Sequence, residues 1–306
     1  MTDEPITKMH KDEVHTDEKL VRRLLATQFP QWEDLPIQSV PSAGTDNALY
    51  RLGEDMVVRL PRIHWAVGQV DKEHEWMPKL APHLPLAIPV PLEMGEPDEG
   101  YPWRWSIYCW LEGENRTMEN IAHSKQTAID LARFLLALQS IDTTGGPLAA
   151  EHELRGEPLA TRDEATREAI TALHGMINVS AVTKVWETAL QSSEWNHAPV
   201  WFHGDVLPGN LLFKNGQLSA VIDFGGLGVG DPACDLMIAW NLFTGDSCNA
   251  FRLALGVDDA TWARGRGHAL SQALIFIPYY MNTNPVGVKN AWRVIAEALA
   301  DSFRNN

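Results

Sequence analysis

The chain has 306 residues, of which 45% are hydrophobic and 21% charged, a composition typical of a globular protein with one large domain or two lobes. Its formal net charge of −15 argues against nucleic acids and anionic membranes as partners, because their phosphate groups attract basic patches. A cationic ligand remains open, although solubility alone also explains such an excess of acids.

Location and redox state are indicated by the first residues and the cysteines. The polar start shows no apolar signal region, and no apolar run is long enough to span a bilayer. The cysteines, Cys109, Cys234 and Cys248, lack Cys-x-x-Cys spacing, which indicates a reducing compartment without disulfides or structural zinc. We therefore expect a cytoplasmic protein with no membrane partner, as a monomer or weak dimer.

The first third of the chain predicts a helix followed by antiparallel strands. Residues 16–30 form an amphipathic pattern with Thr16 or Asp17 near the N-cap and Pro30 at the stop. Short alternating segments separated by Gly and Asn turns fill 37–62, and 68–84 again indicate a helix until the prolines. Residues 104–114 are β-branched and aromatic, which favours one more strand before a connector.

After Gly113 the pattern becomes mostly helical. Residues 127–142 predict a buried helix, residues 144–147 break the chain, and 160–192 contain one or two helices. Helices resume from Pro232. The layout is α+β, with a β-rich part over residues 1–110 and a larger helical part over 111–306 that carries one hairpin.

That hairpin gathers three oxygen-bearing side chains. Asn215-Gly216 favours a two-residue turn, because both central positions of a type I′ turn need positive φ. Pairing the flanking strands brings Asn210, before the first, beside Asp223, after the second. Asn and Asp oxygens suit Mg²⁺, and Asp205 on the preceding loop would then be available to orient a hydroxyl and accept its proton.

The spacing of these residues matches a kinase motif. "HGDVLPGN" has the form H-x-D-x-x-x-x-N and is followed by "DFG", the order of catalytic Asp, metal-binding Asn and metal-binding Asp in protein kinases. With Gly in place of Arg and with "DPACDL" downstream, residues 201–240 closely resemble the aminoglycoside phosphotransferase family, bacterial small-molecule kinases with a protein-kinase-like fold. The resemblance extends over most of the chain and implies a bilobal α+β protein that binds Mg²⁺ and ATP or GTP.

The resemblance also assigns phosphate-binding residues. The loop "SAGTDNALY" lacks G-x-G-x-x-G but resembles the shorter nucleotide loop of the family, with backbone N–H groups near Thr45 and Asp46 facing the phosphates. An ordinary hairpin turn explains this loop equally well. Arg59 occupies the place of the family lysine, with Arg62 as the alternative cation. Glu73 resembles its ion-pair partner more closely than Glu75 does.

Further residues are assigned around the purine base and the catalytic loop. The strand before the connector resembles the family hinge, where the backbone at Leu111 and Gly113 would bind a purine and Trp110 would face it. The alternative is that Trp110 is a core residue. If Trp110 faces the base, its bulk would favour GTP over ATP. The resemblance also implies that three residues support the catalytic loop, namely His203, Asp231 and Asp235. Asp235 would start a helix, where a negative charge interacts favourably with the helix dipole.

The acceptor would bind against residues 150–195 and the C-terminal helices. Candidate side chains there are Asp163, Glu164, Glu168, Tyr279 and Tyr280. The acidic residues suit a cationic aminoglycoside as the acceptor, which implies a role in antibiotic resistance. The aromatic residues equally suit a macrolide. Without any ligand, a solvated helix face explains the acidic residues and an ordinary core explains the aromatic ones. A metabolic kinase for choline, homoserine or an amino sugar shares the same motifs. A non-catalytic nucleotide-binding protein is disfavoured by the complete set of Asp205, Asn210 and Asp223.

Overall fold

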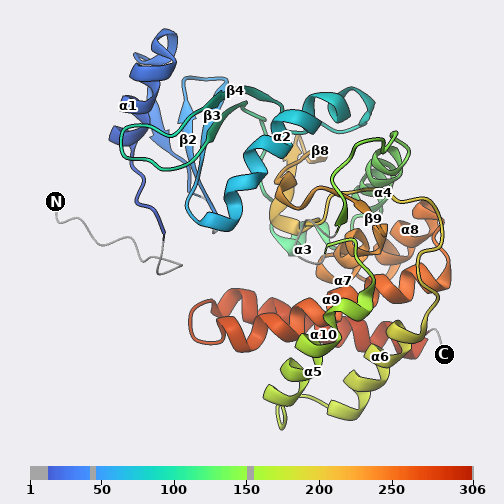
Figure 1. Cartoon of the computed structure of the whole chain (residues 1–306). Helices are drawn as coiled ribbons and strands as arrows, with labels where there is room; N and C mark the ends of the chain where they lie inside the picture. The colour runs from blue at the N-terminus through green and yellow to red at the C-terminus, as the bar shows by residue number, and fades with distance from the viewer. Residues whose placement is uncertain (1–12, 42–45, 150–154, 305–306) are drawn as a thin grey trace. The chain divides into compact units, whose positions relative to one another are not determined.

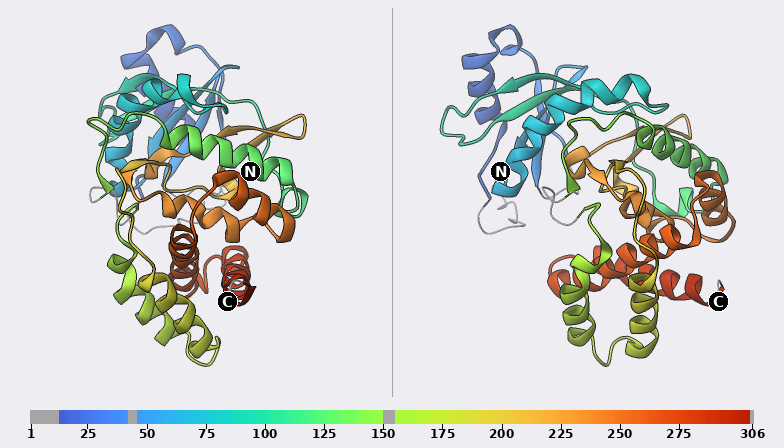
Figure 2. Two further views of the ribbon diagram at one scale, coloured as in Figure 1. Left: turned by 90° about the vertical axis from the view of Figure 1, so that its right-hand side faces the viewer. Right: turned by 45° about the vertical axis from the view of Figure 1, so that its right-hand side comes forward.

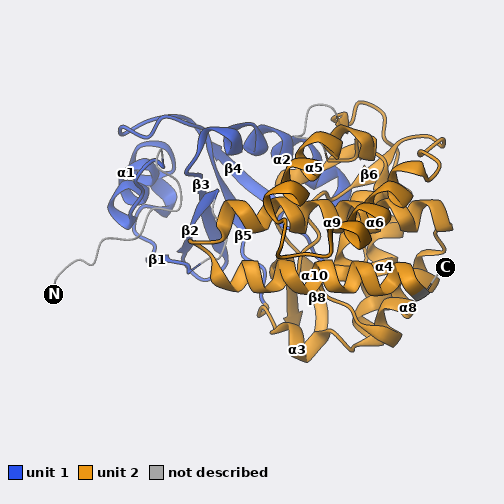
Figure 3. Cartoon of the chain, turned by 90° about the horizontal axis from the view of Figure 1, so that it is seen from below, with its two compact units in different colours: residues 1–82, 87–112 blue, residues 83–86, 113–306 orange. Residues whose placement is uncertain are grey.

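The computed structural model describes residues 13–41, 46–149 and 155–304 (Figure 1). The chain divides into two compact units, which Figure 3 colours separately. The first consists of Met1–Pro82 and Ala87–Glu112, and the second of His83–Leu86 and Gly113–Asn306.

The first unit is built on a five-stranded antiparallel sheet in the order β1-β2-β3-β5-β4. Its strands are β1 (Ile37–Ser39), β2 (Asn47–Leu52), β3 (Met56–Pro61), β4 (Pro91–Gly95) and β5 (Trp105–Cys109), and its helices are α1 (Glu18–Gln28) and α2 (Val67–Leu80). Buried and half-buried residues alternate along β2, as expected for a strand with one face against a core.

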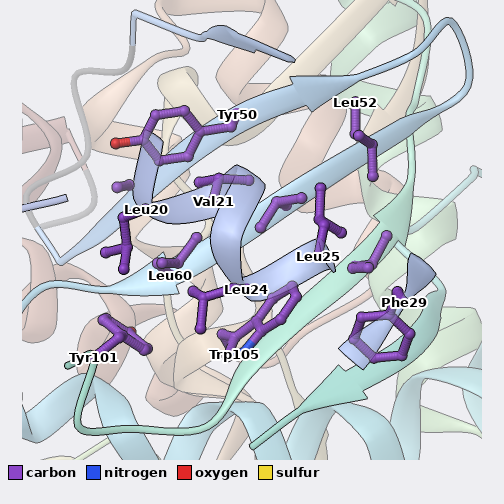
Figure 4. Close-up of a cluster of buried hydrophobic side chains, with 13 residues drawn as sticks. Leu20, Val21, Leu24, Leu25, Phe29, Tyr50, Leu52, Leu60, Tyr101 and Trp105 are labelled. Carbon is purple, nitrogen blue, oxygen red and sulfur yellow. The ribbon is translucent and has the colours of Figure 1, made fainter. Parts of the chain in front are cut away.

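The first helix forms for reasons visible in its sequence. The Asp17 side chain accepts a 2.7 Å hydrogen bond from the Leu20 N–H and so caps the N-terminus. Leu20, Leu24 and Leu25 recur at helical spacing and pack on the sheet with Trp105 (Figure 4). Burial of this apolar stripe fixes α1 against one face of the sheet.

The second unit combines helices with two short antiparallel pairs, β6–β9 and β7–β8. Its strands are β6 (Val200–Phe202), β7 (Leu211–Lys214), β8 (Gln217–Val221) and β9 (Gly228–Gly230). Its helices are α3 (Met118–Ile121), α4 (Lys125–Gln139), α5 (Asp163–Ala172), α6 (Val179–Gln191), α7 (Ile238–Asn241), α8 (Gly245–Leu255), α9 (Asp259–Tyr280) and α10 (Pro285–Arg304). The long helices α9 and α10 run side by side (Figure 2). None of the helices that the structure describes combines the length and apolar character that a membrane span requires.

The expected hairpin is present. Asn215 has φ 52° and Gly216 has φ 82°, the positive values that the turn requires, and Lys214 pairs with Gln217 on either side of it. The predicted helices over 16–30, 68–84 and 127–142 are also confirmed as α1, α2 and α4. The short strands β4 and β9 were not predicted from the sequence; β4 pairs with β5, the next strand along the chain, and β9 pairs with the more distant β6.

Candidate active site

Asp205 lies in the loop between β6 and β7, with both carboxylate oxygens in contact with neighbours. The Asn210 side-chain amide donates to Asp205 Oδ2 over 3.0 Å and to the Asp205 backbone carbonyl over 2.8 Å. The Arg155 guanidinium donates to Asp205 Oδ1 over 3.3 Å. The Asp205 side chain is 25% exposed, so it is accessible while its orientation is restrained.

The hairpin brings the two expected metal ligands to one end of the β7–β8 pair. The Ile222 N–H donates to the Asn210 carbonyl over 2.9 Å, which extends the ladder to the residue before Asp223. Asp223 is exposed and has left-handed backbone angles, φ 66° and ψ 70°. The bonds from Asn210 to Asp205 use only its amide nitrogen, so its amide oxygen can still serve as a ligand.

The donor set fits a hard cation that is only partly held by protein. Among the described residues no three His, Cys, Asp or Glu side chains group in a way that could hold a metal ion. An amide oxygen and one carboxylate suit Mg²⁺, which keeps several waters and takes oxygens from a phosphate ligand. The site therefore fits a metal that arrives with a phosphorylated ligand.

His203 stabilises the loop that carries Asp205. Its ring is fully buried, with Nε2 3.1 Å from the Ile222 carbonyl and Nδ1 accepting from the Asp205 N–H over 3.1 Å. These contacts assign the proton to Nε2, and burial lowers the pKa of His203. Because the Nδ1 lone pair is already used, the imidazole links the loop to Ile222, the residue after β8, rather than accepting a proton from a hydroxyl group.

Asp235 holds the same loop through its backbone. Its carboxylate accepts from the N–H groups of His203, over 2.8 Å, and Gly204, over 2.7 Å. Burial raises the pKa of Asp235, although nearby His203 and the two N–H donors counteract it. Asp235 lies in the first turn of the 3-10 helix Pro232–Met237, and it holds the loop through these direct hydrogen bonds.

Asp231 is the residue that caps that short helix. It accepts from the Ala233 N–H over 3.0 Å and forms a buried ion pair with Arg264, with 2.7 Å between the Asp231 Oδ2 and Arg264 Nε atoms. The Asp231 N–H donates to the Gly156 carbonyl over 2.9 Å. Asp231 thus joins α9 and the 155–156 segment to the support of the loop.

Arg155 is a site residue that sequence reasoning missed. Besides its contact with Asp205, its guanidinium donates to the Gly204 carbonyl. Nothing in the surrounding sequence distinguishes this arginine from its neighbours, because the contact spans about fifty positions and leaves no local pattern.

In the first unit, Arg59 is surrounded by acceptors. Its Nη1 lies 2.6 Å from Glu73 Oε1, and its Nη2 donates to Gln69 Oε1 over 3.0 Å. With its amide oxygen turned toward Arg59, Asn47 accepts from Nε over 3.2 Å and from Nη2 over 2.9 Å. The hydroxyl of Tyr108 donates to Glu73, and burial raises the pKa of Tyr108. Asn47, Gln69 and Tyr108 were not anticipated from the sequence.

The alternatives for this ion pair are placed elsewhere. Glu75 contacts Lys79 on the exposed side of α2, with 3.2 Å between the carboxylate and ammonium groups. The Arg62 N–H donates to the Asp46 carbonyl over 2.7 Å, which ties the end of β3 to the expected phosphate loop. Thr45 lies outside the described residues.

The expected hinge residues follow β5. Trp110 is half-buried, its N–H donates to the Asp55 carbonyl over 2.7 Å, and the Arg51 guanidinium lies 4.0 Å from the centre of its ring. Trp110 is therefore not a buried core residue; its ring forms a cation–π pair with the Arg51 guanidinium. Leu111 is half-buried, and Gly113, the first residue of its stretch in the second unit, is exposed.

The proposed acceptor residues fall on two separate elements. Asp163 starts α5 and accepts from Trp186 Nε1 over 2.7 Å and from Arg167 Nε over 2.8 Å. The hydrogen bond from Trp186 is the main cause of the lowered pKa of Asp163. Glu164 and Glu168 are exposed on the same helix. This geometry favours a structural role for Asp163 and leaves the two glutamates accessible.

The two tyrosines lie at the end of α9. Tyr279 is 68% exposed, and its ring centre lies 4.5 Å from that of Tyr280. Tyr280 also contacts Phe276, with 4.4 Å between ring centres. They form an exposed aromatic patch of the second unit.

Comparison with known proteins places this geometry in a family. The model of the phosphotransferase enzyme family matches residues 38–268. Aminoglycoside 3'-phosphotransferases from Escherichia coli and Salmonella typhimurium are each 28% identical over 140 residues, 45% of this chain and 52% of theirs. The chain thus spans about half the length of the curated relatives it matches.

Solved structures share the fold over nearly the whole chain. The GDP complex of wild-type aminoglycoside 2'-phosphotransferase-IIIa superposes with a TM-score of 0.72 at 17% identity, covering 94% of this chain and 100% of that one. Macrolide 2'-phosphotransferase MphH from Brachybacterium faecium gives a TM-score of 0.61 at 21% identity, covering 92% and 98%. These matches confirm the expected kinase-like α+β fold. With the match to the family model, they show that the chain belongs to the phosphotransferase enzyme family.

Proposed function

We propose that the protein transfers the γ-phosphoryl group of a purine nucleoside triphosphate to a hydroxyl group of a small molecule. The observation that carries this proposal is the arrangement at the β7–β8 hairpin. Asp205 is held by Asn210 beside the end of a hairpin that also presents Asp223. Membership of the phosphotransferase family supports the same reaction class.

In this proposal each residue of the loop has a separate task. Asp205 accepts a hydrogen bond from the acceptor hydroxyl, orients its oxygen toward the γ-phosphorus and takes its proton. Asn210 and Asp223 hold Mg²⁺ through their side-chain oxygens. When bound, Mg²⁺ neutralises phosphate charge during transfer. His203, Asp231 and Asp235 keep the loop in place, and positioning with charge stabilisation supplies most of the rate enhancement.

We assign nucleotide contacts to the first unit and the connector. Arg59, oriented by Glu73, binds the phosphates, and the backbone of Thr45 and Asp46 donates to them. The backbone at Leu111 and Gly113 binds the purine, next to the ring of Trp110. Structural neighbours include a GDP complex and an ADP complex, so the assay has to compare GTP with ATP.

For the acceptor we favour an aminoglycoside. The formal charge of −15 and the exposed acids Glu164 and Glu168 suit a polycation, and the curated relatives carry this activity in their names. A macrolide is the second candidate, because Tyr279 exposes 68% of its surface beside Tyr280 and a structural neighbour is a macrolide phosphotransferase. Both classes carry hydroxyl groups that Asp205 could orient.

A substrate panel tests the proposal. The purified protein is incubated with Mg²⁺, either ATP or GTP, and one candidate acceptor at a time: aminoglycosides, macrolides, choline, homoserine and amino sugars. The mass of each acceptor is then measured by mass spectrometry. We expect the mass gain of one phosphoryl group on at least one aminoglycoside. If only a metabolite or a macrolide gains that mass, the favoured acceptor class is wrong, and if nothing does, phosphotransfer itself is wrong.

Replacing the proposed base gives the first mutational prediction. Asp205→Asn keeps the size of the side chain but removes its negative charge and its basicity, so kcat should fall by about 10²–10⁴-fold. The nucleotide Kd should change little, because Asp205 contacts the acceptor. The matched control is Asp34→Asn, an exposed aspartate of the first unit. Near-native turnover by folded Asp205→Asn would remove Asp205 as the base.

A further inference from the structure

Arg155 contacts the loop at Asp205, the proposed base, and at the residue before it. Its guanidinium donates to the Gly204 carbonyl and, over 3.3 Å, to Asp205 Oδ1. We infer that Arg155 is a positioning residue that sets the orientation of the Asp205 carboxylate toward the acceptor hydroxyl. This inference rests on the phosphotransfer proposed above.

The position of Arg155 is determined by the packing of the residue that follows it. Gly156 has φ +70°, and a Cβ there would lie 2.1 Å from the Phe202 ring. The Gly156 carbonyl accepts from the Asp231 N–H over 2.9 Å. The backbone next to Arg155 is therefore fixed between the end of β6 and the start of the 3-10 helix, which directs the side chain to the loop.

The pair is sheltered enough for its geometry to persist. Arg155 is 27% exposed and Asp205 25% exposed, so neither charge is fully solvated. Fully exposed ion pairs have little effect, whereas partial burial strengthens the attraction. The guanidinium is a planar fork with donors in fixed directions, so it contacts a carbonyl and a carboxylate simultaneously, which a lysine ammonium does less well.

Two different residues restrain the orientation of the Asp205 carboxylate, one at each oxygen atom. Asn210 holds Oδ2 over 3.0 Å, and Arg155 holds Oδ1. In this proposal Arg155 acts through the Asp205 carboxylate rather than by binding the nucleotide or the acceptor, so its effect should appear in the chemical step.

The test compares Arg155→Met, Arg155→Lys and Arg155→Ala with the wild type, using the acceptor that the panel identifies. We expect kcat of Arg155→Met to fall about 10–100-fold, the scale for a misplaced catalytic group, while KM for the nucleotide changes by less than about twofold. Arg155→Lys should recover part of kcat. Guanidinium ion at low concentration should raise kcat of Arg155→Ala.

The controls separate positioning from general stability. Arg133→Met removes an exposed arginine of α4 that forms a surface pair with Asp130, and it should leave kcat and guanidinium response unchanged. Thermal unfolding of every variant shows whether lost activity follows lost fold. Rescue of kcat by guanidinium without a rise in Tm supports positioning, because a purely structural role would change both together.

Several results would overturn the inference. Arg155→Met with kcat close to wild type would show that the contact is dispensable. A loss that follows Tm in all three variants without guanidinium rescue, or failure of all three to fold, would make Arg155 a structural residue. If the wild type itself phosphorylates no acceptor, the proposed function fails first, and that outcome is recognised before any Arg155 variant is compared.

Discussion

At the scale of single residues, Arg59 is the clearest departure from the kinase pattern, which has a lysine at this position. A guanidinium has five N–H donors, and Glu73, Gln69 and Asn47 offer acceptors for all of them. A phosphate that binds Arg59 would therefore replace the neutral amide contacts of Gln69 and Asn47 while the Glu73 pair persists. The arginine is held by its neighbours in a way that a lysine could not reproduce.

This arrangement predicts that lysine, the residue of the family motif, binds the nucleotide less well than arginine at position 59. Arg59→Lys supplies three donors on one atom and leaves Gln69 and Asn47 without theirs, so the nucleotide KM should rise by on the order of tenfold. Initial-rate kinetics with varied ATP or GTP measure it. Arg62→Lys is the matched comparison and should have the smaller effect. If Arg62→Lys raises KM more, the phosphate-binding cation is Arg62.

At the scale of elements, the loop between β6 and β7 depends on one close backbone approach. Gly204 has φ +82°, and a Cβ there would lie 2.3 Å from the Gly226 carbonyl oxygen. The loop therefore lies against the segment that follows Asp223, and His203 and Asp235 hold it there. The glycine in "HGD" meets a steric requirement of this loop.

A matched pair of glycine substitutions tests that requirement. Gly204→Ala adds a methyl group where φ is positive and a backbone oxygen is too close, so unfolding free energy should fall by about 3 kcal/mol or more and kcat should drop. Gly209→Ala, five positions along the same loop, meets no atom within 4 Å and should be far milder. Equal denaturant midpoints for the two variants would contradict this explanation.

At the scale of the whole molecule, α9 carries charged and polar residues through the interior of the second unit. Arg264 pairs with Asp231, Arg266 pairs with Asp301, and His268 is buried with no partner for Nε2 among the described residues. Burial, followed by nearby Arg162, Arg155 and Arg264, lowers the pKa of His268 to about 3. The helix thus connects Asp231, which supports the Asp205 loop, to Asp301 in α10.

The buried histidine makes stability depend on pH. The folded pKa of about 3 lies below the unfolded value of 6.5, so the unfolded state binds a proton that the folded state rejects. Stability should therefore fall as pH drops below 6.5, and the loss from His268 should reach about 1.4 kcal/mol near pH 5.5.

Thermal unfolding at neutral and mildly acidic pH measures this contribution. His268→Leu should show a smaller decrease in Tm on acidification than the wild type, because leucine binds no proton in the unfolded state. His83→Gln, an exposed histidine, is the control and should behave like the wild type. An unchanged pH dependence in His268→Leu would show that other groups, such as buried His203, dominate.

Features set by local chemistry could be predicted from the sequence by itself. The Asn215-Gly216 turn, the Asp17 cap and the spacing of Asp205, Asn210 and Asp223 depend on residues that are close along the chain. Helical and strand periodicities similarly identified α1, α2 and α4. These local rules were enough to identify the hairpin, the kinase motif and the family resemblance.

Only the tertiary structure decided which distant groups support that motif. Arg155 reaches Asp205, Asp235 binds the N–H groups of His203 and Gly204, and Tyr108 binds Glu73 across long stretches of chain. Such contacts arise from packing of several elements at once, so no periodicity or short spacing records them. The sequence determined the chemical groups of the candidate site, and the folded chain determined which neighbours hold them in place.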